Sequence, residues 1–475
     1  MSRPSRIILF VAVGFGALFV LAAAGLLFFV RASLDKVRLE ATASEALGMQ
    51  VSVNGPVRLD IVPGPLVTLE DVHVRNRGVE VASAKEVGLG IGLFSLLRSH
   101  VLIERFALKS PRIVIEKDRD GRYNFENPEA AEASLPALDW PNVSLSDGTL
   151  VYADKQVGEG FEAADCRLDM PRLSLSGGKR ANLMKDLSFT AELACGQIRA
   201  EGFTAFDLKL SVDAKNGVFD LKPLTMRVFG TQGSGSIQAD FSQGIPLYHV
   251  LCTLPQFPIE EFFKVLSPKP VAAGPMDFSV NLAMHGETVK KMRQTAQGQI
   301  SLRGKDLTVS GTDLDRAFSR FESSQHFNLV DVGAFFFAGP LALVVTKGYN
   351  FASNFQGTEG SSEIRTLVSD WKVERGVAQA QDVAMATKEN RVALQGGLDF
   401  VNDQFDDVTM ALIDAKGCAK VRQKIRGTFQ NPVVENPNIL TSAAGPAVRL
   451  LKKGSDLLLG RKCQVFYAGS LAAPK

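Results

Sequence analysis

Alternation of apolar and polar residues with a period of two runs from Val51 to about Leu412. It places one apolar and one polar face on each strand, as in antiparallel meanders. Turn signals such as Asn54-Gly55-Pro56 divide the alternating stretches into short strands. This pattern predicts a mainly β chain: a long, twisted, mostly antiparallel sheet with a few short amphipathic helices.

Helical spacing interrupts the alternation at two places, where apolar residues recur at i, i+3, i+4 and i+7. These residues are Ile259, Phe262, Phe263 and Leu266, and then Leu314, Ala317, Phe318 and Phe321, with Asp313 as the N-cap. A less regular amphipathic helix is predicted over 441–459. Two glycine-rich stretches are interpreted as breaks: Gly88–Arg98 as a helical turn and Gly233–Ser236 as a flexible hairpin.

The predicted helices are too few to cover the apolar faces of so many strands. An uncovered sheet must close, stack on another sheet or be capped. Two solutions remain open. The strands pack as sandwiches that bury their apolar faces, or the sheet curls into a groove whose floor stays apolar.

A run of 24 residues without a charge, Ile7–Val30, precedes the alternating body. As a helix it would span about 36 Å, enough to cross a bilayer core of about 30 Å. A cleavable signal peptide is the alternative, because Arg3 and Arg6 precede the run and small residues occur at 22–24. The run exceeds the usual ~7–15 apolar residues of a signal peptide and continues after the small residues. It therefore predicts a retained, single-pass transmembrane helix.

The five cysteines contain no Cys-x-x-Cys pair and do not cluster with histidines, so no metal site is predicted. Cys166 with Cys195, and Cys418 with Cys463, could each pair within one neighbourhood of the chain, which would place the body in an oxidising compartment. Cys252 would remain a buried free thiol. The alternative is that all five are reduced core residues.

Composition limits the partners. There are 53 Lys and Arg against 51 Asp and Glu, so the net charge of +2 implies no nucleic-acid partner. The 31 Phe, against 5 Tyr and 2 Trp, provide a large apolar surface to bury or to offer to an apolar ligand. No arrangement of residues matches a nucleotide, metal or nucleophilic site. We therefore expect no enzyme activity, no catalytic residue and no cofactor.

Two stretches resemble the AsmA family. One is LGMQVSVNGPVRLDIVPGPLVTLEDVHVRN with the following VASAKEVGLGIGLFSLLRSHVLIERFALKSPRIVIEKDRDGRYNFENP, and the other is GPMDFSVNLAMHGETVKKMRQTAQGQISLRGKDLTVSGTDLDRAF. The resemblance implies a bacterial inner-membrane protein with a cytoplasmic N-terminus and a periplasmic body that serves envelope or outer-membrane biogenesis. This family is similar to chorein-type bridge proteins, whose grooves hold lipid acyl chains, and that similarity favours the groove over the sandwiches.

The segments expected on this basis are a cytoplasmic N-terminus (1–6), the transmembrane helix (7–30), an AsmA/chorein-like N-terminal β region (31–150), a middle β-groove region (151–270), an AsmA-like C-terminal β region (271–430), and a C-terminal helix and tail (431–475).

Two functions from different classes follow. The first is a lipid-holding or lipid-transfer protein, with the inner membrane and its phospholipids as partners. Its groove candidates, assigned by alternation alone, are Leu59, Ile61, Leu69, Leu102, Phe106, Ile113, Phe206, Leu208, Phe278, Val280 and Leu282. The second is a scaffold or assembly factor for outer-membrane proteins that uses its sheet edges to pair with client strands. A hydrolase of unknown type is a distant third.

Overall fold

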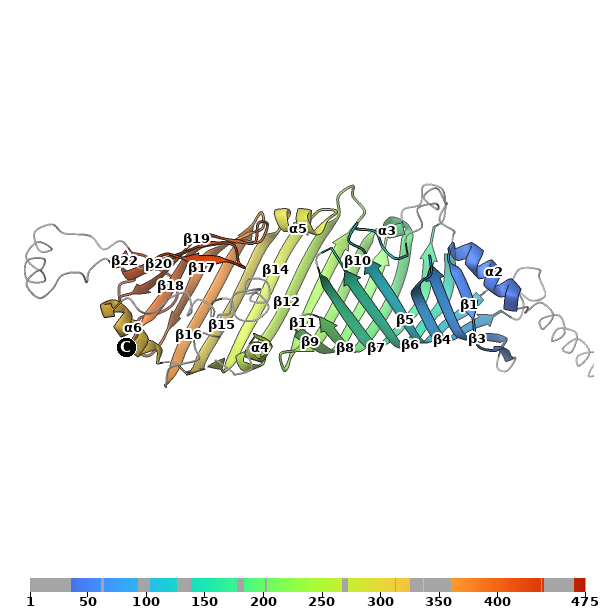
Figure 1. The fold of residues 1–475 in the computed structure, drawn as a ribbon, viewed down its shortest axis with the longest axis horizontal. Helices are drawn as coiled ribbons and strands as arrows, with labels where there is room; N and C mark the ends of the chain where they lie inside the picture. Colours follow the sequence, from blue (N-terminus) through green and yellow to red (C-terminus); the bar gives the residue numbers. More distant parts are fainter. Residues whose placement is uncertain are drawn as a thin grey trace, which may run out of the picture. The chain divides into compact units, whose positions relative to one another are not determined.

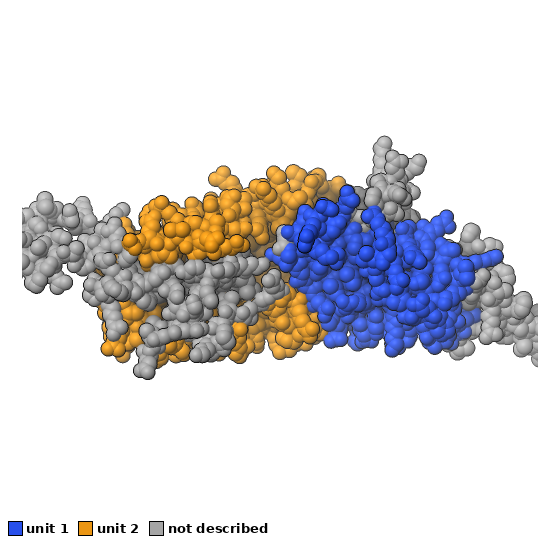
Figure 2. Space-filling model, in the orientation of Figure 1, with its two compact units in different colours: residues 1–180 blue, residues 181–475 orange. Residues whose placement is uncertain are grey.

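The computed structural model describes residues 36–60, 64–92, 103–125, 138–156, 158–176, 183–200, 203–266, 272–311, 313–324, 336, 360–436, 438–439 and 465–474 (Figure 1). The predicted transmembrane helix at Ile7–Val30 and the predicted helix over 441–459 lie outside these residues. Within the described parts of the chain, none of the helices is long and apolar enough to cross a membrane. The chain divides into two compact units, residues 1–180 and 181–475 (Figure 2).

Unit 1 is a mainly antiparallel sheet. The helix α2 (Lys36–Leu47) ends at Gly48, whose φ of 63° suits glycine. The strands are β1 (Gln50–Val53), β2 (Val57–Asp60), β3 (Leu66–Asn76), β4 (Val79–Ile91), β5 (Ile103–Lys117), β6 (Leu138–Asp154) and β7 (Glu159–Leu175). Both β1 and β2 pair with β3, and the order then follows the sequence to β7. The pair β5–β6 is parallel, so the sheet is mixed.

Unit 2 continues the antiparallel pattern. Its strands are β8 (Leu187–Ala200), β9 (Phe203–Lys215), β10 (Val218–Val228), β11 (Thr231–Asp240), β12 (Leu247–Pro258), β13 (Ala272–Ala273), β14 (Pro275–His285), β15 (Gln297–Ser310), β16 (Ser361–Glu374), β17 (Val377–Ala386), β18 (Arg391–Asp399), β19 (Gln404–Ile413), β20 (Ala419–Gly427), β21 (Pro432–Val434) and β22 (Asn438–Ile439). Neighbours in sequence pair from β8 to β12, β12 pairs with β14, and the order continues to β20. The short helices are α3 (Leu183–Asp186), α4 (Ile259–Leu266), α5 (Val289–Thr295) and α6 (Leu314–Ser324).

The two helices predicted from helical spacing are confirmed as α4 and α6. Asp313 caps α6, because its Oδ1 accepts a hydrogen bond from the backbone N–H of Arg316 at 3.0 Å. Ile259, Phe262 and Phe263 of α4 and Leu314 and Phe318 of α6 lie in one buried cluster with the strands of unit 2. The prediction of a mainly β fold with few short helices is therefore confirmed.

Two predicted breaks are wrong where the structure describes them. Gly88–Ile91, the start of the predicted helical turn, belongs to strand β4, and Gly233–Ser236 belongs to strand β11. The rest of the predicted turn, residues 93–98, lies outside the described residues. Gly235 allows close packing within the sheet, because a Cβ added there would lie 2.3 Å from the carbonyl oxygen of Leu251 on the neighbouring strand. A glycine cluster inside a strand marks close backbone approach as readily as a turn.

Cys166, Cys195 and Cys418 are disulfide-bonded, as the sequence predicted for each of them, and Cys463 lies outside the described residues. Cys252 is the free thiol among the described cysteines, as predicted, but it is half-buried and not fully buried. Burial raises the pKa of the Cys252 thiol, so its reactivity as a thiolate is low at neutral pH. The bonded cysteines are consistent with an oxidising compartment.

Gly298 gives a test of the register in unit 2. Its φ is 144°, and a Cβ added there would lie 2.0 Å from the carbonyl oxygen of Asn281 on β14. Gly298→Ala is therefore expected to lower the free energy of unfolding by about 1–3 kcal/mol, measured by urea denaturation. Gly244→Ala is the control, because nothing lies within 4 Å of the added atom. Equal stability of the two variants would contradict the β14–β15 register.

Candidate functional site

Cross-strand pairing in unit 1 aligns apolar residues from successive strands in rows. The row that we call the Phe106 row consists of Leu59, Val67, Leu89, Phe106, Val143 and Met170. The adjacent Leu108 row consists of Val57, Leu69, Val87, Leu108, Leu145 and Leu168. Two continuous hydrocarbon rows therefore cross the strands of unit 1 side by side.

The side chains of these rows are half-buried, except for Val67 at 3% exposure. Phe106 stacks on Trp140 with ring centroids 5.4 Å apart and an interplanar angle of 24°. Large apolar side chains that remain partly open to solvent along a whole row are unusual, because a protein ordinarily buries such a face.

The opposite face of the unit 1 strands is polar. Arg105, next to Phe106 in the chain, is exposed, and Lys109 binds Glu86 with a distance of 3.1 Å between Nζ and Oε1. Arg58 binds Glu70 in the same way on β2 and β3. The two faces therefore differ in chemistry, as the alternation predicted.

Unit 2 carries two corresponding rows. The Trp371 row consists of Leu193, Leu210, Leu224, Gly235, Cys252, Val280, Ile300, Trp371 and Ala380. The Val373 row consists of Ala191, Val212, Leu221, Ile237, Val250, Leu282, Gly298, Val373, Ala378, Leu398 and Phe405.

Burial changes along the rows of unit 2. From β8 to β14 their large side chains are half-buried, including Cys252 and Val280. From β15 onward they are core residues: Ile300 is 6% exposed, Trp371 2% and Val373 3%. These two rows are thus partly open over the first strands of unit 2 and sealed over the later ones, while Leu254 and Phe278, beside the rows on β12 and β14, are already buried.

A buried hydrogen-bond chain lies at the sealed end. The indole Nε1–H of Trp371 donates to Ser369 Oγ at 2.7 Å, and the Ser369 hydroxyl donates to the carbonyl oxygen of Phe336 at 2.7 Å. Trp371 is 2% exposed, and Ser369 and Phe336 are 0% exposed. Because each polar group has a partner, the chain fixes Phe336 against β16 without leaving a buried donor unsatisfied.

Most of the predicted groove residues that the structure describes belong to these rows or flank them. Leu59, Leu69, Phe106, Val280 and Leu282 are members of the rows. Ile113 pairs with Ala82 and Leu150. Ile61 and Leu102 lie outside the described residues.

The other three predicted groove residues are less open or differently placed. Leu208 is 9% exposed and pairs with Cys195, and Phe278 is 7% exposed and pairs with Leu254 and Leu302. Phe206 pairs with Arg227, whose guanidinium carbon lies 5.2 Å from the ring centroid. The same guanidinium binds Asp207 at 2.8 Å. The Phe206 ring therefore serves a cation–π contact.

Trp140, Val250 and Cys252 also lie on or beside the apolar rows, although they were not predicted as site residues. Val250 and Cys252 belong to an alternating segment, so alternation could have found them. The Phe106 partner Trp140 follows only from three-dimensional contact.

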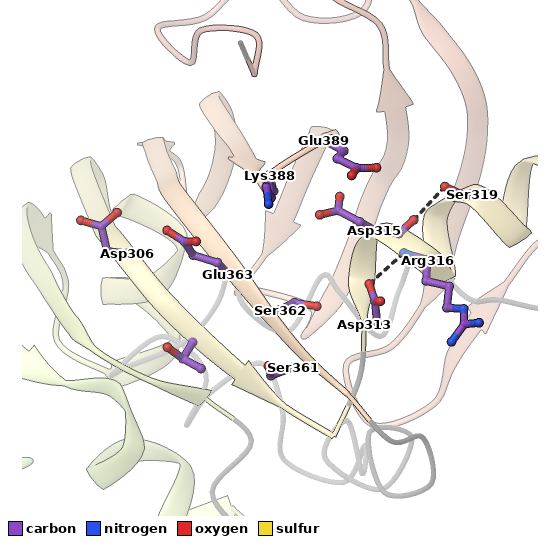
Figure 3. Close-up of a pocket in the computed structure, with 11 residues that line it drawn as sticks. Asp306, Asp313, Asp315, Arg316, Ser319, Ser361, Ser362, Glu363, Lys388 and Glu389 are labelled. Carbon is purple, nitrogen blue, oxygen red and sulfur yellow. Dashed lines mark hydrogen bonds between the residues drawn. The ribbon is translucent and has the colours of Figure 1, made fainter.

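A polar depression of about 830 Å³ lies between β15, β16 and α6 in unit 2 (Figure 3). Five carboxylates line it with Arg316 and Lys388: Asp306, Asp313, Asp315, Glu363 and Glu389. Asp313 caps α6, and Asp315 accepts hydrogen bonds from Asn390 and Thr387 at 2.8 and 2.5 Å. No group of three potential metal ligands occurs among the described residues. Asp313 and Asp315 therefore have structural roles, in the helix cap and the β17–β18 turn respectively.

The fold and the apolar rows define a class: a β-sheet protein whose described strands, in each unit, present a partly open hydrocarbon face. The AsmA family model matches residues 1–176 and 174–382, so the chain belongs to the AsmA family, as its sequence suggested. No curated protein and no solved structure matches the chain significantly.

Proposed function

We propose that this protein is a non-enzymatic component of envelope and outer-membrane biogenesis that holds or transfers phospholipid. In this proposal the apolar faces of both units serve as grooves for acyl chains, and headgroups remain in water. The AsmA family is envelope-associated, and membership of it supports this role. The run Ile7–Val30 would anchor the chain in the bacterial inner membrane with its body in the periplasm, which is consistent with the disulfide-bonded cysteines.

The observation that carries the proposal is the pair of half-buried rows in unit 1. Apart from the Met170 thioether, their side chains are hydrocarbon, so they offer no donor for a polar ligand. A long, thin hydrocarbon ligand fits a row that crosses several strands. Each CH₂ that it removes from water would contribute about 0.8 kcal/mol.

The test is photocrosslinking in cells from two neighbouring positions with opposite orientation. A benzophenone amino acid replaces Phe106, on the apolar row, or Arg105, which is exposed on the polar face. Adducts are identified by phospholipid mass. We expect lipid adducts from position 106 and several-fold fewer from position 105.

Lipid adducts at neither position would refute lipid holding by unit 1. Protein adducts in their place would favour the alternative function, a scaffold that assembles outer-membrane proteins. The comparison is repeated with the benzophenone amino acid at Leu108, on the adjacent apolar row, and at Lys109, on the polar face of the same strand.

A further inference from the structure

The two apolar rows of unit 2 continue from the strands where they are half-exposed, β8–β14, onto strands where they are buried, β15 and beyond. On the Trp371 row, Val280 is half-buried, the next member, Ile300, is 6% exposed, and Trp371 is 2% exposed. The chemistry of the side chains does not change at this point, since all three are apolar. What changes is the packing against them, so the end of the open surface is set by tertiary structure and not by the apolar pattern.

Two described elements contribute to the closure, the helix α6 and Phe336. The helix α6 contributes Phe318 to the cluster that contains Trp371, whereas α4 packs on β12 and β13, with Phe262 against the Phe229 ring. The carbonyl oxygen of Phe336 is held by Ser369, which in turn accepts a hydrogen bond from the Trp371 indole. Because the interior is packed at 0–2% exposure around this hydrogen-bond chain, it has no room for an additional hydrocarbon chain.

The open part of the row is longer than one acyl chain. It crosses six strands, β8, β9, β10, β11, β12 and β14, and at a spacing of roughly 4.8 Å it extends about 24 Å. A bilayer core of about 30 Å contains two leaflets, so one acyl chain extends about 15 Å. Unit 2 could therefore hold one acyl chain lengthwise ahead of the closure.

We propose that the apolar face of unit 2 is a blind lipid site, in which an acyl chain lies along the rows between β8 and β14 and is stopped by the block of Ile300, Trp371 and Phe336. This inference rests on the proposed lipid-holding function. It adds that lipid does not pass over β15–β20, so unit 2 takes up and releases its lipid at the open strands and is not a conduit to its C-terminal strands.

The two tryptophans of the chain allow a direct test, because Trp371 is the reporter for the closed end and Trp140 can be removed. The full-length Trp140→Phe protein is reconstituted in phosphatidylcholine vesicles with dibrominated acyl chains, and quenching of Trp371 fluorescence is measured. A second protein, Trp140→Phe, Trp371→Phe, Val280→Trp, places the fluorophore two members earlier on the same row. We expect several-fold stronger quenching at position 280 than at Trp371.

Cys252 provides a second measurement that changes no residue of the row. It is half-buried on the Trp371 row next to Val280, and it is the free thiol among the described cysteines. Its rate of alkylation by N-ethylmaleimide, followed by peptide mass, is expected to fall several-fold when phosphatidylcholine is supplied. Cys252→Ser identifies the labelled peptide. This measurement remains valid if the Val280→Trp protein does not fold.

The outcomes separate the two proposals. Quenching of Trp371 equal to that at position 280 would overturn the blind site and leave lipid holding intact. Protection of Cys252 without quenching of Trp371 would support the blind site. No quenching at position 280 and no protection of Cys252 would refute lipid holding by unit 2 itself.

Discussion

Replacing Trp371 with alanine is expected to lower the free energy of unfolding by about 3–5 kcal/mol, the range for deleting a large buried aromatic side chain. Trp371 is 2% exposed and lies in the main cluster of unit 2 with Phe262 and Phe318. The substitution would leave a cavity that rigid neighbouring strands cannot fill. Urea denaturation followed by circular dichroism measures the loss.

Trp140→Ala is the matched control, because Trp140 is half-buried and stacks on Phe106 alone among the described aromatic rings. Loss of the Trp140–Phe106 stacking should lower the free energy of unfolding by about 1 kcal/mol, the scale of one aromatic pair, in addition to the small loss of buried area. Trp371→Phe keeps most of the ring volume and removes the hydrogen bond to Ser369, so an intermediate loss of about 1–2 kcal/mol is expected. A Trp371→Ala protein no less stable than Trp140→Ala would show that the later strands of unit 2 are not a closed core.

Local periodicity predicted the strands and two helices because both are short-range properties. Period-two alternation depends on successive side chains pointing to opposite faces, and the i, i+3, i+4 spacing of Phe262 and Phe318 with their neighbours depends on one helical turn. Neither pattern depends on which other strands or helices the segment packs against. The glycines of β4 and β11 were misinterpreted because close packing on a neighbouring strand, such as Gly235 against Leu251, leaves no local signal.

Alternation fails as a guide to the apolar face wherever a left-handed residue interrupts a strand. Asp71 has a φ of 54° within β3, and Leu69 before it and Val72 after it belong to one hydrophobic cluster although they are three residues apart. Asp207, also at 54°, separates Phe206 from Leu208 in β9. Each such residue shifts the apolar positions by one, as a bulge does. This explains why Leu208 is buried while Phe206 faces Arg227.

The boundary between open and closed surface could not be predicted from the sequence at all. Phe278, Val280 and Leu282 form one alternating series, yet Phe278 is 7% exposed and the other two are half-buried. The difference depends on α4, α6 and Phe336, which come from distant parts of the chain. Burial is a tertiary property, and a period of two carries no information about what covers a face.

The C-terminal segment 465–474 is expected to detach from unit 2 when Asp382 is replaced with asparagine. Tyr467 Oη donates to Asp382 Oδ1 at 2.5 Å, and the Ser470 hydroxyl and backbone N–H donate to Oδ2 at 2.6 and 3.0 Å. In asparagine one carboxylate oxygen is replaced by an NH₂ group, which cannot accept a hydrogen bond from Tyr467 or Ser470. We expect a loss of about 2–3 kcal/mol at pH 7, the scale of hydrogen bonds to a charged group. Hydrogen exchange at the Ser470 and Leu471 amides measures the release.

The pH dependence of this effect follows from the direction in which the pKa of Asp382 is shifted. Burial acts to raise the pKa of Asp382, but the hydrogen bonds from Ser470 and Tyr467 outweigh it and hold the pKa below its ordinary value. A carboxyl with a lowered folded-state pKa stabilises the fold above its unfolded pKa of about 3.9. That stabilisation is lost as the pH falls through the lower folded-state pKa. The difference between the native protein and Asp382→Asn should therefore be full at pH 7 and vanish in that acid range.

Asp407→Asn is the control for charge alone, because Asp407 is a 75% exposed carboxylate that binds Lys424 at 3.2 Å. An exposed pair of this kind contributes about 0–1 kcal/mol. If the Ser470 and Leu471 amides exchanged no faster in Asp382→Asn than in Asp407→Asn, the segment would be held by the hydrogen bonds that Arg391 and Gln395 donate to the carbonyl oxygens of Leu471 and Phe466, and by its apolar contacts. Those contacts join Phe466, Tyr467 and Leu471 to the alanines of β17–β19. A faster exchange that is specific to Asp382→Asn would instead identify one carboxylate as the attachment point of the C-terminal segment on the strands that close unit 2.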